Sequence, residues 1–478
     1  MTANANWYFP LLAHKAGVRT FDVSSGMNYV SVKDQVVRAT VLVNSLLQCK
    51  LFDGERKQYD VVVIGAGVAG VAAASHAAGH GLKVLVLEGA DERFPLQKKC
   101  TSRHVSFSMY DWPEAHAAKG VFPSLGDMPV KSEAGFFFPC SVLSEHPVPA
   151  SELVTGWDRE IEGYKYPSGS IRWEFGVKVT PPSYRGNALL VDDRDADAVT
   201  IHFRHTNGRD TYAVAKVLIF ATGIGTERTV PNTEKPGSPY QPPSFWSDLD
   251  DAPWQEDVDL SERTAFLSGN GDGAIQDFLK IVYRKAAINL LALVEACKLS
   301  LGQMARIVSA ERHVARQLMW NTPVTEAYAA LQVVFDEIVA EVLAAHKDPL
   351  DVGIAEQTCP KIVWVAETAE PAKQRIVFSK TYALNRFLAT LTLAKLRDSP
   401  KLRLVAGQTN SVHKDEKGVH RCKTSSGTEY RSDFAPLLRH GVDKNTGLGS
   451  SADYFGLRSA LAGAPLPFKP SDFPVKPI

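Results

Sequence analysis

The chain has 478 residues, and its 53 Lys and Arg balance 53 Asp and Glu, so its formal charge is zero. At roughly 150 residues per domain, this length predicts two or three domains. Hydrophobic residues make up 45%, enough for a large buried core. The neutral balance excludes a general basic field for nucleic acid or an anionic membrane. These figures favour a soluble enzyme that acts on small molecules.

The N-terminal residues and the hydropathy pattern predict a cytoplasmic location. Residues 1–13 lack a basic run followed by an apolar stretch, so no signal peptide is expected. No segment has eighteen consecutive apolar residues, which argues against a membrane span. We therefore expect a small-molecule substrate as the partner, with no nucleic acid and no membrane; the oligomeric state stays open.

Cysteine and histidine spacing predicts neither a dithiol centre nor a metal site. The six cysteines are scattered without a CxxC pair, and we expect reduced, mostly buried thiols. His313 lies between two arginines on a predicted helix, with no second His or Cys one turn away. No metal is expected.

A helical pattern over residues 32–51 ends at Asp53-Gly54, and we expect this helix to pack on the domain that follows. Residues 60–70 then read DVVVIGAGVAG, a buried strand running into a glycine turn. A small-residue helix over 71–78 and a second buried strand over 82–88 follow, and that strand ends in Glu88. The pattern is that of a dinucleotide site.

Each residue of this first turn has a predicted physical role. Gly65 makes the tight turn, Gly67 lets the backbone approach a diphosphate, and Gly70 lets helix and strand pack closely. Ala66 lies within the turn, and the N–H groups at the helix start attract the phosphates. Glu88, eighteen positions after Gly70, can accept hydrogen bonds from ribose hydroxyls.

Strand signals continue downstream of a polar and aromatic stretch over residues 103–112. Segments 171–179 and 198–204 are strand-like, and Asn207-Gly208 predicts a hairpin. Residues 216–223, KVLIFATG, form another buried strand that ends in Ala-Thr-Gly, with Thr222 and Gly223 as candidate cofactor contacts.

In this order of motifs the chain resembles the two-dinucleotide-domain flavoproteins, a group that includes thioredoxin-reductase-like enzymes and flavin-containing monooxygenases. The resemblance implies FAD at the first glycine turn, and a β-meander that leads to the Ala-Thr-Gly strand. It also implies a second, nicotinamide-binding fold, which opens in this chain at residues 263–274, RTAFLSGNGDGA. Gly269, Gly271 and Gly273 can bring backbone close to phosphates there, and Ala274 gives the GxGxxA variant.

The second fold differs from the family pattern in three ways. Residues 274–346 are almost continuously helical in pattern, which predicts a helical insertion before the next strand, 361–367. That strand ends in Glu367, which we compare with Glu88 and which favours NADH over NADPH. Asp272 lies inside the turn, where a carboxylate repels phosphate unless it faces away.

The C-terminal part predicts a helix from residue 382, meander strands near 402–405, 418–423 and 429–430, and a closing strand over 433–438. That strand ends in Arg439-His440-Gly441, where the resemblance implies Ala-Thr-Gly. The predicted fold class is therefore α/β, a Rossmann-like FAD domain plus a second Rossmann-like domain with a helical insertion. The expected division is an N-terminal helical segment (1–58), the FAD domain with its meander (59–260), the second domain (261–445, insertion about 275–350) and a tail (446–478).

Two histidines are the catalytic candidates. His104 could shuttle a proton near the flavin, and its neighbour Arg103 could neutralise a phosphate or bind a substrate carboxylate. His440 follows a buried strand, at an edge where the related fold places loops near its ligand. The competing interpretations are that Tyr110 and Trp112 are core aromatics and His104 is a hydrogen-bonded structural residue, and that Arg439 and His440 only cap the strand and bond to neighbouring carbonyls.

Three electron routes stay open at this point. In the first, NADH or NADPH reduces FAD and oxygen is the acceptor, as in a monooxygenase. In the second, the substrate itself reduces the flavin, as in a nicotinamide-independent oxidase or dehydrogenase. In the third, the second fold has lost nucleotide binding and acts as a structural or substrate-binding domain. A non-enzyme alternative is a flavin- or nucleotide-binding module whose helical insertion docks a partner. We expect a FAD-dependent oxidoreductase of a small organic molecule.

Overall fold

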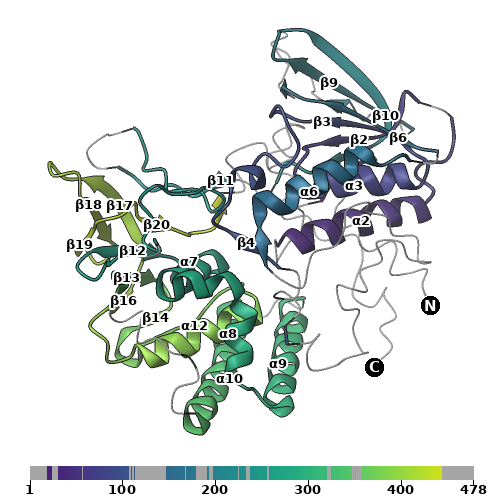
Figure 1. Ribbon diagram of the computed structural model, residues 1–478. Helices are drawn as coiled ribbons and strands as arrows, with labels where there is room; N and C mark the ends of the chain where they lie inside the picture. The colour runs from purple at the N-terminus through teal and green to yellow at the C-terminus, as the bar shows by residue number, and fades with distance from the viewer. Residues whose placement is uncertain are drawn as a thin grey trace.

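The protein is described here by a computed structural model (Figure 1). It describes residues 19–23, 31–55, 57–106, 109, 112–113, 147–166, 168–178, 191–192, 197–223, 226–232, 237–255, 258–319, 324–346, 350 and 358–443. Tyr110 and the predicted tail 446–478 lie outside these ranges.

An eight-stranded sheet organises the first domain. Its strands are β1 (Thr20–Asp22), β2 (Tyr59–Ile64), β3 (Lys83–Leu87), β6 (Ser170–Glu174), β7 (Val177–Lys178), β8 (Val191–Asp192), β9 (Val199–His205) and β10 (Asp210–Phe220). The order β6-β3-β2-β10 is parallel, with β1 added beside β10, while β9 pairs antiparallel with β10. The predicted hairpin is confirmed, since Gly208 has φ +85° and donates to the His205 carbonyl at 2.8 Å.

The two faces of this sheet bury different partners. Its helices are α2 (Val32–Gln48), α3 (Val68–Gly79) and α6 (Ala150–Gly163), which share one side of the sheet in Figure 1. Val61 and Val63 of β2 pack with these helices, whereas Val62 and Ile64 pack with Val199 and its neighbours in the meander. Alternation along a strand therefore places helices on one face and the meander on the other. Short elements complete the domain: η1 (Gln97–Lys99), β4 (His104–Val105) and β5 (Val148–Pro149).

The second domain repeats this plan. Its parallel sheet has the order β16-β13-β12-β20, and a three-stranded meander has the order β17-β18-β19. The bounds are β12 (Thr264–Ser268), β13 (Lys361–Ala366), β16 (Leu402–Ala406), β17 (Thr409–Lys414), β18 (His420–Thr424), β19 (Glu429–Ser432) and β20 (Leu437–Leu438). A hairpin of β14 (Ala369–Glu370) and β15 (Arg375–Ile376), joined by η4 (Pro371–Lys373), follows β13.

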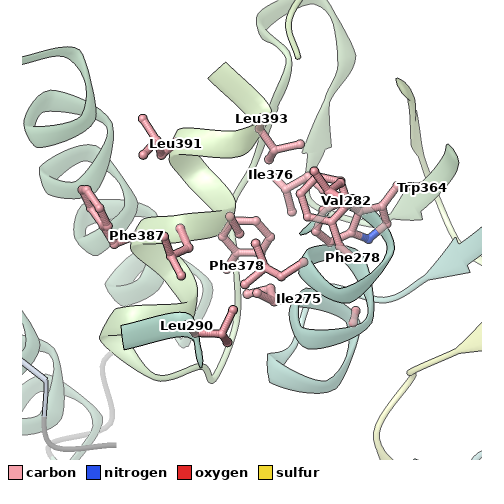
Figure 2. Packing of buried hydrophobic residues seen from close by; sticks show 14 of the residues in the cluster. Ile275, Phe278, Val282, Leu290, Trp364, Ile376, Phe378, Phe387, Leu391 and Leu393 are labelled. Atoms are coloured by element: carbon pink, nitrogen blue, oxygen red, sulfur yellow. The ribbon is translucent and has the colours of Figure 1, made fainter. Parts of the chain in front are cut away.

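A helical insertion separates the first two strands of the second sheet. The helices of the second domain are α7 (Asp272–Tyr283), η3 (Arg284–Asn289), α8 (Leu290–Ala296), α9 (Leu301–Met319), α10 (Val324–Ala345) and α12 (Ala383–Lys395). In Figure 1, α8, α9 and α10 extend away from the sheet beyond α7 and α12. Figure 2 shows Phe278 of α7, Trp364 of β13 and Phe387 of α12 within one core. The predicted α/β class with two Rossmann-like domains and a helical insertion is confirmed.

The buried Arg386 holds the insertion to the rest of the domain. It donates to Gln332 Oε1 of α10 at 3.0 Å and to the carbonyls of Phe378 and Ser379. The Gln332 amide also donates to Thr390 of α12 at 2.9 Å.

Among the described residues, no single helix has the length and apolar character of a membrane span. Asp272–Ala296 and Leu301–Val314 reach that level only as a pair bent by 115°.

The two domains are joined by a second small sheet. β11 (Thr226–Glu227) leaves the first domain and pairs antiparallel with β21 (Val442–Asp443), which follows the closing strand of the second domain. Sequence patterns did not predict β1, α6, β17 or this pairing. Two- and three-residue strands carry too little periodicity to be recognised, and α6 follows a long polar stretch.

Candidate functional site

The first glycine turn is held by backbone contacts that admit only glycine at two positions. Gly65 has φ +105°, and its N–H donates to the Leu87 carbonyl at 2.8 Å. A Cβ on Gly65 would collide with the Ala221 carbonyl oxygen, and one on Gly70 would collide with the Gly65 carbonyl oxygen. The tight approach of β2, α3 and the end of β10 therefore depends on these two glycines.

Gly67 has a different environment, which fits the role predicted for it. It precedes α3 with φ −71°, and a Cβ there would meet no atom of the described residues within 4 Å. The first N–H groups of a helix have no acceptor within the helix, and they attract anions. This open space and the helix start beneath it, here called the first cradle, leave room for an anionic group.

Glu88 lies beside this cradle, as the spacing predicted. Its carboxylate accepts hydrogen bonds from the N–H of Ala66 at 2.5 Å and of Ala90 at 2.8 Å. Each carboxylate oxygen has a further lone pair available, so Glu88 can still accept from ribose hydroxyls. The turn, the helix start and the acid together fit the adenosine diphosphate part of FAD.

Thr222 and Gly223 close this edge of the sheet directly after β10. The Ala221 N–H donates to the Ile64 carbonyl at 2.8 Å, which continues the β2 pairing up to the glycine turn. Gly223 has φ +87°, so the chain turns away there in a backbone conformation that favours glycine.

The second glycine turn has the same backbone frame. Gly269 has φ +126° and donates to the Val365 carbonyl at 2.9 Å, and Arg439 N–H donates to the Ser268 carbonyl at 2.7 Å. A Cβ on Gly269 would collide with the Arg439 carbonyl oxygen. Gly441 has φ +81°, close to the value for Gly223. Arg439-His440-Gly441 is therefore the counterpart of Ala221-Thr222-Gly223, so the departure noted in the sequence lies in the side chains alone.

Asp272 does not face the second cradle as a free charge. One carboxylate oxygen accepts from Thr381 Oγ1 at 2.7 Å, Asn385 Nδ2 at 2.8 Å and the Tyr382 N–H at 3.2 Å. The other accepts from Gln276 Nε2 at 2.6 Å. The carboxylate thus binds the residues that begin α12, which removes the objection that it repels phosphate.

Gly271 and Gly273 have closer neighbours than Gly67 has in the first turn. A Cβ on Gly271 would lie 3.5 Å from Ser379 Oγ, and one on Gly273 would lie 3.5 Å from Arg439 Cδ. The Asp272 N–H already donates to the Lys380 carbonyl at 3.3 Å. The segment 379–380 therefore lines the second turn, whereas no segment in the described part of the chain lies comparably against Gly67.

Glu367 is not the counterpart of Glu88. Ile64 pairs with Leu87 in the first sheet, and the equivalent Ser268 pairs with Val365 in the second. The position of Glu88 is thus taken by the buried Ala366, and Glu367 comes one residue later with an exposed side chain. One residue along an extended chain reverses the side-chain direction, so the expected equivalence is wrong and the NADH preference loses its structural basis.

Arg103 lies buried at the contact between the two domains. It donates to Asp277 of α7 and, through Nε, to the Phe245 carbonyl at 2.9 Å. Arg439 Nε donates to the other Asp277 oxygen at 2.7 Å, and Arg439 Nη1 pairs with Glu227 at 3.0 Å. Burial raises the pKa of Asp277, but the charges of Arg103 and Arg439 outweigh it and hold that pKa low. The guanidinium of Arg103 thus joins the domains and is already paired.

The two catalytic candidates lie on different domains. His104 is in β4, opposite Pro149 of β5. His440 is half-buried and its Nε2 lies 2.7 Å from Ser268 Oγ. Burial lowers the pKa of His440, and the charge of Arg228 lowers it further. Trp112 packs against Phe387 with ring centroids 5.7 Å apart, the packing role considered for it.

Sequence patterns missed a lysine beside the charged network at the domain contact. Lys280 lies one turn after Asp277 on α7, and its Nζ is 4.2 Å from the Trp254 ring centroid. Burial, with the nearby charge of Arg103, lowers the pKa of Lys280 to about 7. The sequence shows a single lysine among apolar residues between Phe278 and Ile281. Its position beside the charged network could be recognised only once the tertiary structure was known.

The described residues contain no cluster of three or more His, Cys, Asp or Glu side chains that could hold a metal ion. Five cysteines within them are free thiols, namely Cys49, Cys100, Cys297, Cys359 and Cys422. Burial raises the pKa of Cys100, Cys297 and Cys422, so these thiols are poor nucleophiles.

Several solved structures are similar to this chain at low identity. Bacillithiol disulfide reductase Bdr (YpdA) from Bacillus cereus is 11% identical, with 80% of this chain and 78% of that chain covered at a TM-score of 0.38. The FAD-bound form 2 of OTEMO is 16% identical, with coverages of 84% and 73% and a TM-score of 0.40. Thioredoxin reductase from Lactococcus lactis in its FR conformation is 12% identical, with coverages of 81% and 78% and a TM-score of 0.34.

No curated protein sequence matches the chain. Residues 59–242, however, match the family model described as pyridine nucleotide-disulphide oxidoreductase. This range runs from the strand before the first glycine turn through the meander and past Gly223. Over residues 59–242, the chain is therefore similar to the pyridine nucleotide-disulphide oxidoreductases.

Proposed function

We propose that this chain is a FAD-dependent oxidoreductase of a small organic molecule, with NADH or NADPH as electron donor and oxygen as acceptor, as in a monooxygenase. Bound FAD supplies the hydride and electron-transfer chemistry, and the protein orients it and controls access to it. Gly65, Gly67 and Gly70 would shape the FAD cradle, and Glu88 would hold the adenosine ribose. Gly269, Gly271 and Gly273 would shape the nicotinamide dinucleotide cradle.

One observation carries this proposal: the backbone frame of the glycine turn occurs twice. Gly65 and Gly269 have the same sign of φ, the same hydrogen bond to the neighbouring strand, and the same contact with the closing strand. Two dinucleotides on one chain suit the transfer of a hydride from nicotinamide to flavin. The polar contacts of Asp272 support the second site, because they direct its charge toward α12.

A second candidate function is a flavin oxidase or dehydrogenase that uses no nicotinamide. The observation in its favour is the segment 379–380, whose Ser379 hydroxyl and Lys380 carbonyl line the second turn. A carbonyl oxygen repels phosphate oxygens. The N–H groups of Gly273 and Ala274, in the first turn of α7, can still donate to a phosphate. For this reason we prefer the route that uses NADH or NADPH.

Flavin binding is tested with Gly67→Leu. The open space and φ of −71° at Gly67 predict that this variant folds and fills the cradle. Gly156→Leu on α6 is the matched control, because that position is also open. Purified wild type and Gly156→Leu should be yellow and retain FAD, while Gly67→Leu should lose it with an unchanged far-UV spectrum. Equal FAD content in all three proteins contradicts the assignment of the cradle.

The electron donor is tested by adding NADH and NADPH separately to the FAD-loaded protein without oxygen. Bleaching of the flavin absorbance with either supports the first candidate, and Gly271→Leu should then slow it strongly. Bleaching with neither, in a protein that retains FAD, selects the second candidate.

A further inference from the structure

His440 occupies a defined place at the edge of the second sheet. It occupies the position that Thr222 has in the first domain. Arg439 before it hydrogen-bonds to Ser268 of β12, and Gly441 after it has a positive φ. The carboxyl edge of a parallel sheet is where such folds bind their ligands. His440 therefore lies at the same sheet edge as the second turn.

A chain of buried hydroxyls leads to one ring nitrogen of His440. Thr409 Oγ1 donates to Ser268 Oγ at 2.8 Å, and Ser268 Oγ lies 2.7 Å from His440 Nε2. Thr409 and Ser268 are both buried. Ser268 receives the Thr409 hydrogen, which leaves its own hydrogen available for Nε2, and we assign Nε2 as the acceptor on this basis. The proton of a neutral His440 ring then resides on Nδ1, for which no partner is seen within the described part of the chain.

Arg228 places a positive charge beside this ring. Its backbone N–H donates to the Gly441 carbonyl at 3.0 Å, which extends the β11–β21 pairing to the residue next to His440. The Arg228 side chain is exposed, and it has no carboxylate partner among the described residues. Its charge and the burial of the ring both lower the pKa of His440, so the ring is neutral near pH 7.

We propose that His440 donates its Nδ1–H to an oxygen of the diphosphate of a nicotinamide dinucleotide bound at the second turn, with Arg228 supplying the neutralising charge. This inference rests on the proposed function. His440 is thus a binding and positioning residue for the electron donor, which differs from the catalytic role considered for it from the sequence. Because Ser268 already holds the neutral His440 ring, the ring does not have to reorient when the diphosphate binds.

The test measures affinity of the full, FAD-loaded chain for ADP-ribose and for NAD⁺ by calorimetry. His440→Ala should weaken both about tenfold, the effect of losing one hydrogen bond to a charged group. His440→Asn, whose side-chain amide can replace Nδ1–H, should stay within about threefold of wild type. Arg228→Ala should weaken binding and reduce its salt dependence. His202→Ala, at an exposed histidine of the first-domain meander, is the control and should change nothing.

The tautomer is a readout that is independent of binding. Nitrogen NMR of ¹⁵N-histidine-labelled protein should show His440 neutral near pH 7 with its proton on Nδ1, identified by the signal lost in His440→Asn. Ser268→Ala should release this preference and weaken ADP-ribose binding about threefold.

Three results would overturn the inference. The first is wild-type affinity for ADP-ribose in His440→Ala while Gly271→Leu no longer binds it, which leaves the proposed function standing. The second is an Nε2–H or doubly protonated ring in the wild type. The third is no binding of ADP-ribose, NADH or NADPH to the wild type, in which case the nicotinamide route of the proposed function fails as well.

Discussion

The two dinucleotide folds of this chain share one backbone plan and differ in the side chains on it. Their sheets have the same strand order, and both glycine turns make the same hydrogen bonds. In the first fold α3 is almost entirely small and apolar, and it is buried among α2, α6 and the sheet. In the second, the residues equivalent to Val68, Ala73 and His76 are Asp272, Asp277 and Lys280.

The difference follows from what each helix packs against. α3 packs in an apolar cluster of its own domain, whereas α7 also meets the first domain through Arg103 and the residues near Phe245. The second fold therefore carries a buried charged network that the first does not need. The same backbone frame thus occurs in both domains, but α7 of the second domain also positions one domain on the other.

Removal of Asp277 should have the largest effect on stability. Asp277→Ala leaves Arg103 and Arg439 buried without their shared carboxylate, which should lower the free energy of unfolding by about 3–5 kcal/mol. Asp251→Ala is the control, because its pair with Arg263 is more exposed (56% and 35%) and should cost less than about 1 kcal/mol. Denaturant unfolding measures both. Equal losses would show that the charged network does not distinguish the second fold.

Alanine at the turn glycines tests whether the two frames are equivalent. Gly65→Ala introduces a Cβ at φ +105° against the Ala221 carbonyl, and should cost about 3 kcal/mol. Gly269→Ala should cost a similar amount, because Gly269 has the same contact with Arg439. Gly67→Ala, at φ −71° in open space, should change stability little. Thermal unfolding of the three variants measures the effect, and tolerance of Gly269→Ala would break the comparison.

Replacement of Asp272 by the first-fold residue tests what the carboxylate does. Asp272→Val removes the acceptor for Thr381, Tyr382 and Asn385 at the start of α12, and should cost about 1–2 kcal/mol. Gln276→Ala, which removes only one donor to that carboxylate, should cost less than about 1 kcal/mol. If Asp272 instead repels the dinucleotide, Asp272→Val will bind NADH more tightly than wild type; we expect no gain.

The pH dependence of stability tests the lysine of the domain contact. Burial lowers the pKa of Lys280 to about 7 in the folded chain, against 10.5 for the free side chain. The unfolded chain therefore binds the extra proton between these values, and this group makes stability rise with pH by up to about 1.4 kcal/mol per unit across that window. Below pH 7 its penalty is complete, and above 10.5 it is absent.

Lys280→Met should remove this slope and be more stable than wild type at pH 7, with the difference shrinking toward pH 10. Unfolding at several pH values measures both proteins. A wild-type slope that survives in Lys280→Met would mean that another group carries the proton uptake.

Much of the fold followed from local pattern. The strand–turn–helix–strand unit at 60–88 and the second glycine turn combine apolar strands, glycines and small helical residues whose spacing has one physical interpretation. The helical insertion was recognisable because 3.6-residue periodicity persists through α8, α9 and α10. Glu88 was also found from spacing alone, and the structure places its carboxylate on the turn.

The amino-acid sequence by itself thus determined two dinucleotide-type folds in order, a flavin-oxidoreductase resemblance and the insertion between them. Only the tertiary structure decided that Glu367 is one residue out of register, that Arg103 is bound to Asp277, and that Asp272 faces α12. Backbone turns are coded locally, by φ and by the space that a missing Cβ leaves. The partner of a charged side chain is set by contacts between segments as distant as Arg103, Glu227, Asp277 and Arg439, and no local spacing records those contacts.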